Sequence, residues 1–136
     1  MATKIFVNLP VKDLNKSVEF FTKLGFSFNP KFTDENATCM IIGEDIFVML
    51  LVEKFFKNFT KKEIADTSKT IEAMVTLSAD SREAVDALVE KAIAAGAATP
   101  NESYEEQDFM YGRSFEDLDG HHWDIMFMDS SAVNQE

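Results

Sequence analysis

One structural pattern occurs twice in this sequence. Residues 6–25 read as a short strand, a turn, an amphipathic helix and a glycine that ends the helix, and residues 72–96 read the same way. Each copy is followed by further strand-like sequence. Two copies of one strand–helix–strands unit in 136 residues predict a pseudo-symmetric sheet. Any functional site is then expected where the two halves face each other.

Length and charge narrow the functions to consider. The 136 residues, 46% of them hydrophobic, are enough for one domain with its own core. The formal net charge of −11 argues against binding to nucleic acid or an anionic membrane, because both need a basic face. It is compatible with a cationic ligand, and equally with a surface that only keeps the protein in solution. We expect neither a signal peptide nor a membrane span, because no apolar run approaches roughly 18–20 residues.

Cys39 is the lone cysteine, so no internal disulfide can form. A reducing compartment, the cytoplasm, is therefore the expected location. Because Cys39 lies in an apolar strand, we interpret it as a small core residue rather than a nucleophile.

The first repeat begins with a strand at residues 5–11. Its aliphatic side chains share one face, which we expect helices to cover, whereas Phe6 and Asn8 share the other, as in a cavity wall. Asp13 can cap a helix that runs to about Leu24 and stops at Gly25. Further strands are expected at residues 26–32, 37–42 and 46–52.

A connector, residues 53–69, joins the two repeats. Phe55, Phe56 and Phe59 lie at helical spacing, and residues 60–63 have the form of a capping box before a short helix. The connector is either a linker packed on the core or a mobile wall over a pocket.

The second repeat is expected to start with a strand at Thr70. Glu72, Met74 and Thr76 would then face away from the helices. Asp80 or Ser81 caps the following helix. An acidic loop is expected at residues 100–108, strands at 109–115 and 122–128, and a loose tail at 130–136.

Two stretches of the sequence resemble the two ends of one known superfamily. Residues 7–21, followed by Leu24-Gly25-Phe26, are similar to its opening strand, V-x-D-L turn and S-x-x-F-Y helix. Residues 112–124 are similar to its closing G-R-x-F…D-P-D-G-N-x-x-E segment, with Leu118 in place of the proline. The superfamily is the vicinal oxygen chelate group, which includes glyoxalase I, extradiol dioxygenases, fosfomycin-resistance enzymes and bleomycin-resistance proteins.

This resemblance implies an α+β fold for a single domain, residues 1–136. Two βαβββ modules, residues 4–52 and 70–129, would form a curled, half-open mixed sheet around a cavity. We also expect a homodimer, because a half-open sheet leaves apolar edges that symmetric pairing hides.

In the metal-dependent members of the superfamily, four strands each offer one ligand to a divalent ion. The resemblance matches these positions to Phe6, Met49, Glu72 and Asp124. Phe6 and Met49 cannot bind a hard cation, so only two of the roughly three protein ligands of a catalytic site remain. We therefore expect no cofactor, with a divalent metal held by Glu72, Asp124 and His122 as the alternative.

The expected cavity is largely apolar with a few polar groups, as small-molecule pockets are. Glu72 and Asp124 are the candidate catalytic residues. The candidate ligand-binding residues are Phe6, Asn8, Met49, Met74, Tyr111, Arg113, His122 and Met126. Structural interpretations stay open for most of them. The methionines and phenylalanines can be plain core, and Arg113 can pair with Glu116 or Asp117. Glu72 can pair with a neighbour in the sheet, His122 can hydrogen-bond the turn, and Asp124 can anchor hydrogen bonds inside the cavity.

Two functions follow from these residues. The first is a metal-free module that binds a small organic ligand, as bleomycin-resistance proteins do. The second is a lyase, isomerase or dioxygenase in which a metal polarises vicinal oxygens while Glu72 or Asp124 moves a proton. An interaction protein without a ligand is a third interpretation.

Overall fold

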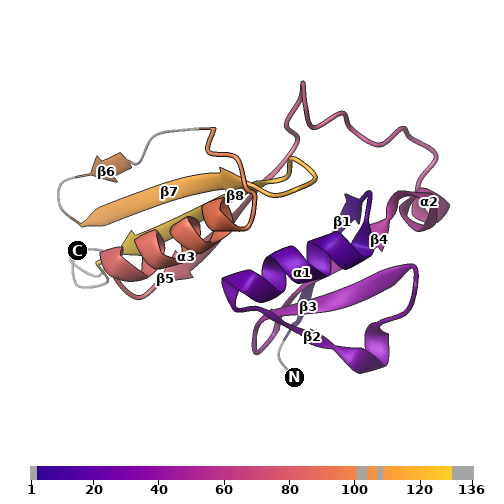
Figure 1. Ribbon diagram of the computed structural model, residues 1–136, viewed down its shortest axis with the longest axis horizontal. Coiled ribbons are helices and arrows are strands. Elements are labelled where there is room, and N and C mark those ends of the chain that lie inside the picture. The colour runs from indigo at the N-terminus through magenta and orange to yellow at the C-terminus, as the bar shows by residue number, and fades with distance from the viewer. Residues whose placement is uncertain (1–2, 101–103, 107–108, 130–136) are drawn as a thin grey trace. The chain divides into compact units, whose positions relative to one another are not determined.

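The computed structural model describes residues 3–100, 104–106 and 109–129 (Figure 1). The chain divides into two compact units, Met1–Asp66 and Thr67–Glu136, and their boundary falls inside the predicted connector. Each unit builds its own four-stranded sheet from one βαβββ repeat. The prediction of an α+β fold with two such modules is confirmed.

The first unit forms a mixed sheet in the order β1-β4-β3-β2. The parallel pair is β1 with β4, and the other pairs are antiparallel. Its elements are β1 (Ile5–Val11), α1 (Leu14–Leu24), β2 (Ser27–Asn29), the 3-10 turn η1 (Pro30–Phe32), β3 (Ala37–Gly43), β4 (Ile46–Val52), α2 (Glu53–Phe56) and the 3-10 turn η2 (Lys57–Phe59).

Helix α1 begins and ends where the sequence predicts. The Asp13 carboxylate accepts a hydrogen bond from the backbone N–H of Lys16 at 3.1 Å, and Gly25 takes the left-handed φ of 107° that ends the helix. Phe20 and Phe21 are buried and meet edge to face. Cys39 is also buried, as predicted, and burial raises the pKa of its thiol, which keeps it protonated and poorly reactive.

The second unit repeats this arrangement with the order β5-β8-β7-β6. Here β5 and β8 form the parallel pair. Helix α3 packs on β7 and β8, and the side chain of Ser81, rather than Asp80, caps it by accepting from the N–H of Ala84 at 3.0 Å. The elements are β5 (Met74–Ala79), α3 (Arg82–Ala94), β6 (Tyr104–Glu106), β7 (Met110–Glu116) and β8 (His122–Met128).

Strand β5 starts four residues later than predicted, at Met74 instead of Thr70. The reason is the position at which its partner strand, β8, begins. Met74 pairs with His122, the first residue of β8, so the residues before Met74 have no strand beside them in that register. Glu72 therefore precedes the sheet.

Three other predicted elements differ from the structure. No helix begins at Thr60, because the short helical turns α2 and η2 precede it; the Thr60 hydroxyl accepts from the N–H of Lys62 at 3.1 Å instead. The strand expected at 26–32 ends at Asn29, because Pro30 has no N–H for the ladder and opens a 3-10 turn.

The loop expected at 100–108 contains β6, which pairs with β7. The tail predicted for residues 130–136 lies outside the described residues. Within the described part of the chain, no helix is long and apolar enough to cross a membrane.

Candidate functional site

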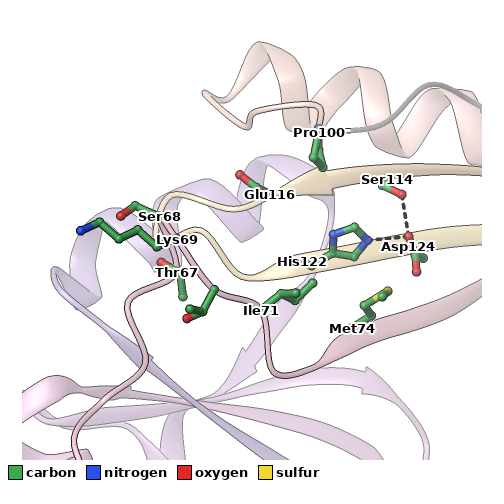
Figure 2. A pocket seen from close by; sticks show the side chains of 11 residues that line it. Thr67, Ser68, Lys69, Ile71, Met74, Pro100, Ser114, Glu116, His122 and Asp124 are labelled. Carbon is green, nitrogen blue, oxygen red and sulfur yellow. Dashed lines mark hydrogen bonds and ion pairs between the residues drawn. The ribbon is translucent and has the colours of Figure 1, made fainter.

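The second unit contains an open pocket of about 580 Å³ (Figure 2). One wall is the segment of residues 67–71. The other wall is the sheet, from which β5 supplies Met74, β7 supplies Ser114 and Glu116, and β8 supplies His122 and Asp124. Pro100 also lines the pocket.

Strand alternation explains why these residues meet. Successive side chains of a strand point to opposite faces, so His122 and Asp124 share one face of β8 while Trp123 and Ile125 are buried on the other. The pairing register then sets Ser114 of β7 and Thr76 of β5 on either side of Asp124. Asp124 and its three polar neighbours therefore come together through strand pairing alone, and no turn or loop supplies any of them.

Asp124 is the centre of this polar cluster. Its Oδ1 accepts a hydrogen bond from the Ser114 hydroxyl at 2.6 Å and lies 2.8 Å from His122 Nε2 (Figure 2). Its Oδ2 has a 3.5 Å contact with the Thr76 hydroxyl, which is beyond the usual O–H···O range. The side chain of Asp124 is 16% exposed and that of His122 6% exposed. Asp124 is therefore a nearly buried carboxylate whose Oδ1 is held by hydrogen bonds and whose Oδ2 remains able to accept one.

The cluster does not have the geometry of a nucleophilic triad. In a triad the histidine lies between the serine and the acid. Here Ser114 and His122 both contact the same oxygen of Asp124. The serine therefore serves to fix the carboxylate.

Three of the predicted site residues meet in the pocket: Met74, His122 and Asp124. Met126 lies on the same face of β8 as Asp124, but it is not among the residues that line the pocket. Glu72 is exposed, precedes β5 and does not line the pocket either. The structure therefore does not bring the predicted carboxylate pair together in this pocket.

Counting from the helix caps would have placed the fifth strand correctly. Phe6 lies 13 − 6 = 7 residues before the cap Asp13, and Met74 lies 81 − 74 = 7 residues before the cap Ser81. Met74 is therefore the counterpart of Phe6 in the repeat, and Glu72 lies two residues before the matching position.

Phe6, Asn8 and Met49, three further candidates, belong to the first unit. Phe6 is half exposed and stacks on Phe47 of β4 with 4.9 Å between the ring centroids. Asn8 and Met49 are register partners on β1 and β4 and share that face. Their role in ligand binding stays a prediction.

Arg113 and Tyr111 lie on the helix-covered face of β7. Arg113 makes ion pairs with Asp86 at 3.1 Å and Glu90 at 2.9 Å, both on α3, and the Tyr111 hydroxyl donates to Asp86 at 2.5 Å. The alternative pairing of Arg113 with Glu116 or Asp117 is not what the structure has, because Arg113 reaches the acidic residues of α3 and Asp117 binds the turn and Trp123. The signal in the sequence was the acidic pair at i and i+4 on α3.

The turn between β7 and β8 depends on Asp117, which is buried and binds the turn rather than Arg113. The Asp117 carboxylate accepts hydrogen bonds from the N–H groups of Asp119 and His121 and from the Trp123 indole, at 2.9, 3.0 and 3.0 Å. Burial raises the pKa of Asp117, and these bonds and nearby His121 oppose the rise. The D-x-D-G sequence of this turn was the available signal.

The donor set fits a metal ion poorly. In the described ranges no three side chains of His, Cys, Asp or Glu gather as a metal site would require. His122 and Asp124 offer two donors on one strand, fewer than the roughly three protein ligands of a catalytic metal site.

Comparison with known proteins points to one family. A family model described as bleomycin resistance protein-like N-terminal matches residues 3–43. A solved structure of a hypothetical protein from S. aureus is 36% identical, with a TM-score of 0.78; the match covers 93% of this chain and 95% of that chain. No curated protein matches this chain.

More distant structures share the fold. A glyoxalase/bleomycin resistance protein/dioxygenase family enzyme from Burkholderia phytofirmans is 21% identical, with a TM-score of 0.80 and coverage of 93% of this chain and 99% of that chain. The fosfomycin resistance protein FosX from Listeria monocytogenes is 18% identical, with a TM-score of 0.67 and coverage of 93% and 91%.

The contacts of Asp86 predict a pH dependence of stability. The hydroxyl of Tyr111, with the Arg113 guanidinium beside it, holds the pKa of Asp86 below its ordinary value of 3.8. A lowered folded-state pKa means that the stabilisation is complete above about pH 4 and is lost as the pH falls through the folded value. Asp86→Asn should therefore lower the free energy of unfolding, measured by urea titration, by more at pH 7 than at pH 2.

Tyr111→Phe is the matched variant, since it removes only the hydroxyl donor. It should reduce the same pH-dependent difference without abolishing it, because Arg113 remains. An equal loss of stability at pH 2 and pH 7 in Asp86→Asn would contradict this account.

Proposed function

Because this chain belongs to the vicinal oxygen chelate superfamily, the group of glyoxalases, bleomycin resistance proteins and dioxygenases, we propose that it binds a small organic ligand in the pocket of its second unit. Binding takes place in the cytoplasm and without the usual metal centre. The reducing compartment is supported by Cys39, the lone cysteine, which is buried in β3.

The observation that carries this proposal is the half-satisfied carboxylate of Asp124. Its Oδ1 is held by Ser114 and His122, whereas its Oδ2 has only the long contact with Thr76 among the described residues. A carboxylate oxygen accepts hydrogen bonds, and bonds from a charged donor are the strongest. A ligand with an ammonium or similar cationic group therefore suits this position.

The rest of the pocket suits an apolar ligand body. Ile71 and Met74 are 57% and 61% exposed, and both line the pocket. Methionine adapts its shape to irregular ligands, and burial of such side chains against a ligand removes apolar area from water. The formal net charge of −11 further favours the approach of cations.

Benzylamine should raise the melting temperature of the protein more than benzyl alcohol, which has the same ring without the charge. Asp124→Asn should weaken benzylamine binding by about tenfold or more, because a hydrogen bond to a charged group is lost. Differential scanning fluorimetry across a concentration series measures both effects.

Asp80→Asn is the control, since it removes one negative charge from an exposed position of the same unit outside the pocket. Its benzylamine response should match that of the native protein. Equal responses to the amine and the alcohol, or equal losses in the two variants, would count against the proposal.

The alternative function is a metal-dependent lyase, isomerase or dioxygenase with Glu72 or Asp124 as the base. The adjacent donors His122 and Asp124 are the observation in its favour. Metal-free protein should gain no melting stability from nickel, zinc, manganese or iron(II) beyond that seen in Asp124→Ala. Stoichiometric metal that is lost in Asp124→Ala or Glu72→Ala would establish the metal enzyme instead.

A homodimer is part of the proposal. Strand β1 is an edge of the first sheet, and it exposes Ile5 and Phe6 by 53% and 50%. Exposed apolar side chains on a sheet edge favour pairing with a second chain. Light scattering at micromolar concentration should give about twice the chain mass of 15.4 kDa, and Phe6→Glu should lower it. A native protein of monomer mass would refute the dimer.

A further inference from the structure

We infer that Thr67 is a positioning residue that fixes the width of the pocket, by holding one pocket wall against the turn from which the other wall begins. This inference rests on the proposed function for its consequence in ligand choice. The holding contact itself is a feature of the second unit alone.

The contact joins Thr67 to the turn between β7 and β8. The Thr67 hydroxyl donates a hydrogen bond to the backbone carbonyl of Asp119 at 2.6 Å. Loss of one such bond is enough to change a local opening equilibrium several-fold. The bond links positions 52 residues apart in the sequence.

Gly120 allows Thr67 to come this close. Its φ is +79°, and a Cβ built on it would lie 2.5 Å from Thr67 Oγ1 and 2.9 Å from Thr67 Cβ. By contrast, a Cβ on Gly96, which also has positive φ, would meet only the end of the Leu118 side chain, at 3.3 Å. The place of Gly120 is therefore set by contact with Thr67 as well as by the turn.

The turn itself is rigid where Thr67 binds it. Asp117 accepts from the N–H groups on both sides of Gly120, those of Asp119 and His121, and also binds Trp123. Thr67 is thus fastened to a structure built on buried side chains rather than to a free loop.

Both pocket walls leave from this point. Thr67 opens the segment 67–71, which lines one side of the pocket, and the turn leads directly into His122 on the other side (Figure 2). The Thr67 contact holds one end of this segment to the turn, and the Met74–His122 pairing holds the strand that follows it to β8. A change at the Thr67 contact should therefore change the spacing of the walls.

Thr67→Val tests the inference, because valine keeps the shape and removes the hydroxyl. Amide hydrogen exchange at residues 68–71 should become about three- to tenfold faster, as expected for the loss of one such bond. Thr67→Ser, which keeps the hydroxyl, should exchange like the native protein. Unchanged exchange at residues 68–71 in Thr67→Val would overturn the inference.

Thr33→Val is the matched control. Its hydroxyl also donates to a backbone carbonyl, that of Asn29 at 2.8 Å, but in the first unit. It should leave exchange at residues 68–71 unchanged, and equal acceleration by both variants would overturn the inference. If Thr67→Val does not fold, Gly120→Ala disturbs the same contact from the other side and must accelerate the same amides.

The effect of the Thr67 contact on the size of ligand that the pocket accepts is measured with two amines. In Thr67→Val the affinity for 1-naphthylmethylamine should rise relative to that for benzylamine, because the wall can move outward. An unchanged ratio would refute control of the width. If neither amine binds the native protein, the proposed function fails, and hydrogen exchange still decides whether Thr67 positions the wall.

Discussion

The second unit depends on strand β8, because it is hydrogen-bonded along both edges. It pairs in parallel with β5 and antiparallel with β7, so its register fixes both neighbours. Trp123 and Ile125 are buried on the face that α3 covers, whereas His122 and Asp124 lie on the pocket face. A shift of one residue would exchange the two sets, burying a carboxylate and a histidine under the helix and exposing the largest core side chain. The hydrophobic core thus determines which side chains of β8 face the pocket.

The two repeats use the same frame with different chemistry. Equivalent positions of the two sheets carry different side chains. The pair Phe6–Phe47 of the first sheet corresponds to Met74–His122 of the second. The pair Asn8–Met49 corresponds to Thr76–Asp124. The first face is stacked and aromatic, and the second carries the polar cluster. Of these paired positions, only those of the second sheet include a carboxylate, so the two halves of the repeated fold present different chemistry.

Much of the fold could be predicted from sequence because its signals are local. Helix caps at Asp13 and Ser81 and the stop at Gly25 are set by neighbouring residues, and the structure has them within one position. The start of β5 could not be predicted in this way, because it depends on where β8 begins, some 48 residues later. The site was predicted only in part for the same reason. The shared face of His122 and Asp124 could be predicted, because it depends only on alternation along one strand.

Side chains that find partners on another element were harder to place. Arg113 was assigned to a ligand or to its sequence neighbours, whereas its partners are on α3, which the alternation of β7 decides. The sequence around Thr67 does not indicate its contact with Gly120. Such contacts join positions far apart in sequence, so the neighbours of one residue do not identify its partner.

Trp123 has a further consequence for anyone who studies this chain in solution. It is the single tryptophan, it is 1% exposed, and its indole N–H is bound to Asp117 in the turn that supports the pocket. Intrinsic emission excited at the indole band therefore reports on the second unit alone, while circular dichroism averages over both. Disagreement between the two signals during denaturation would reveal whether the halves of the repeat melt together or one at a time.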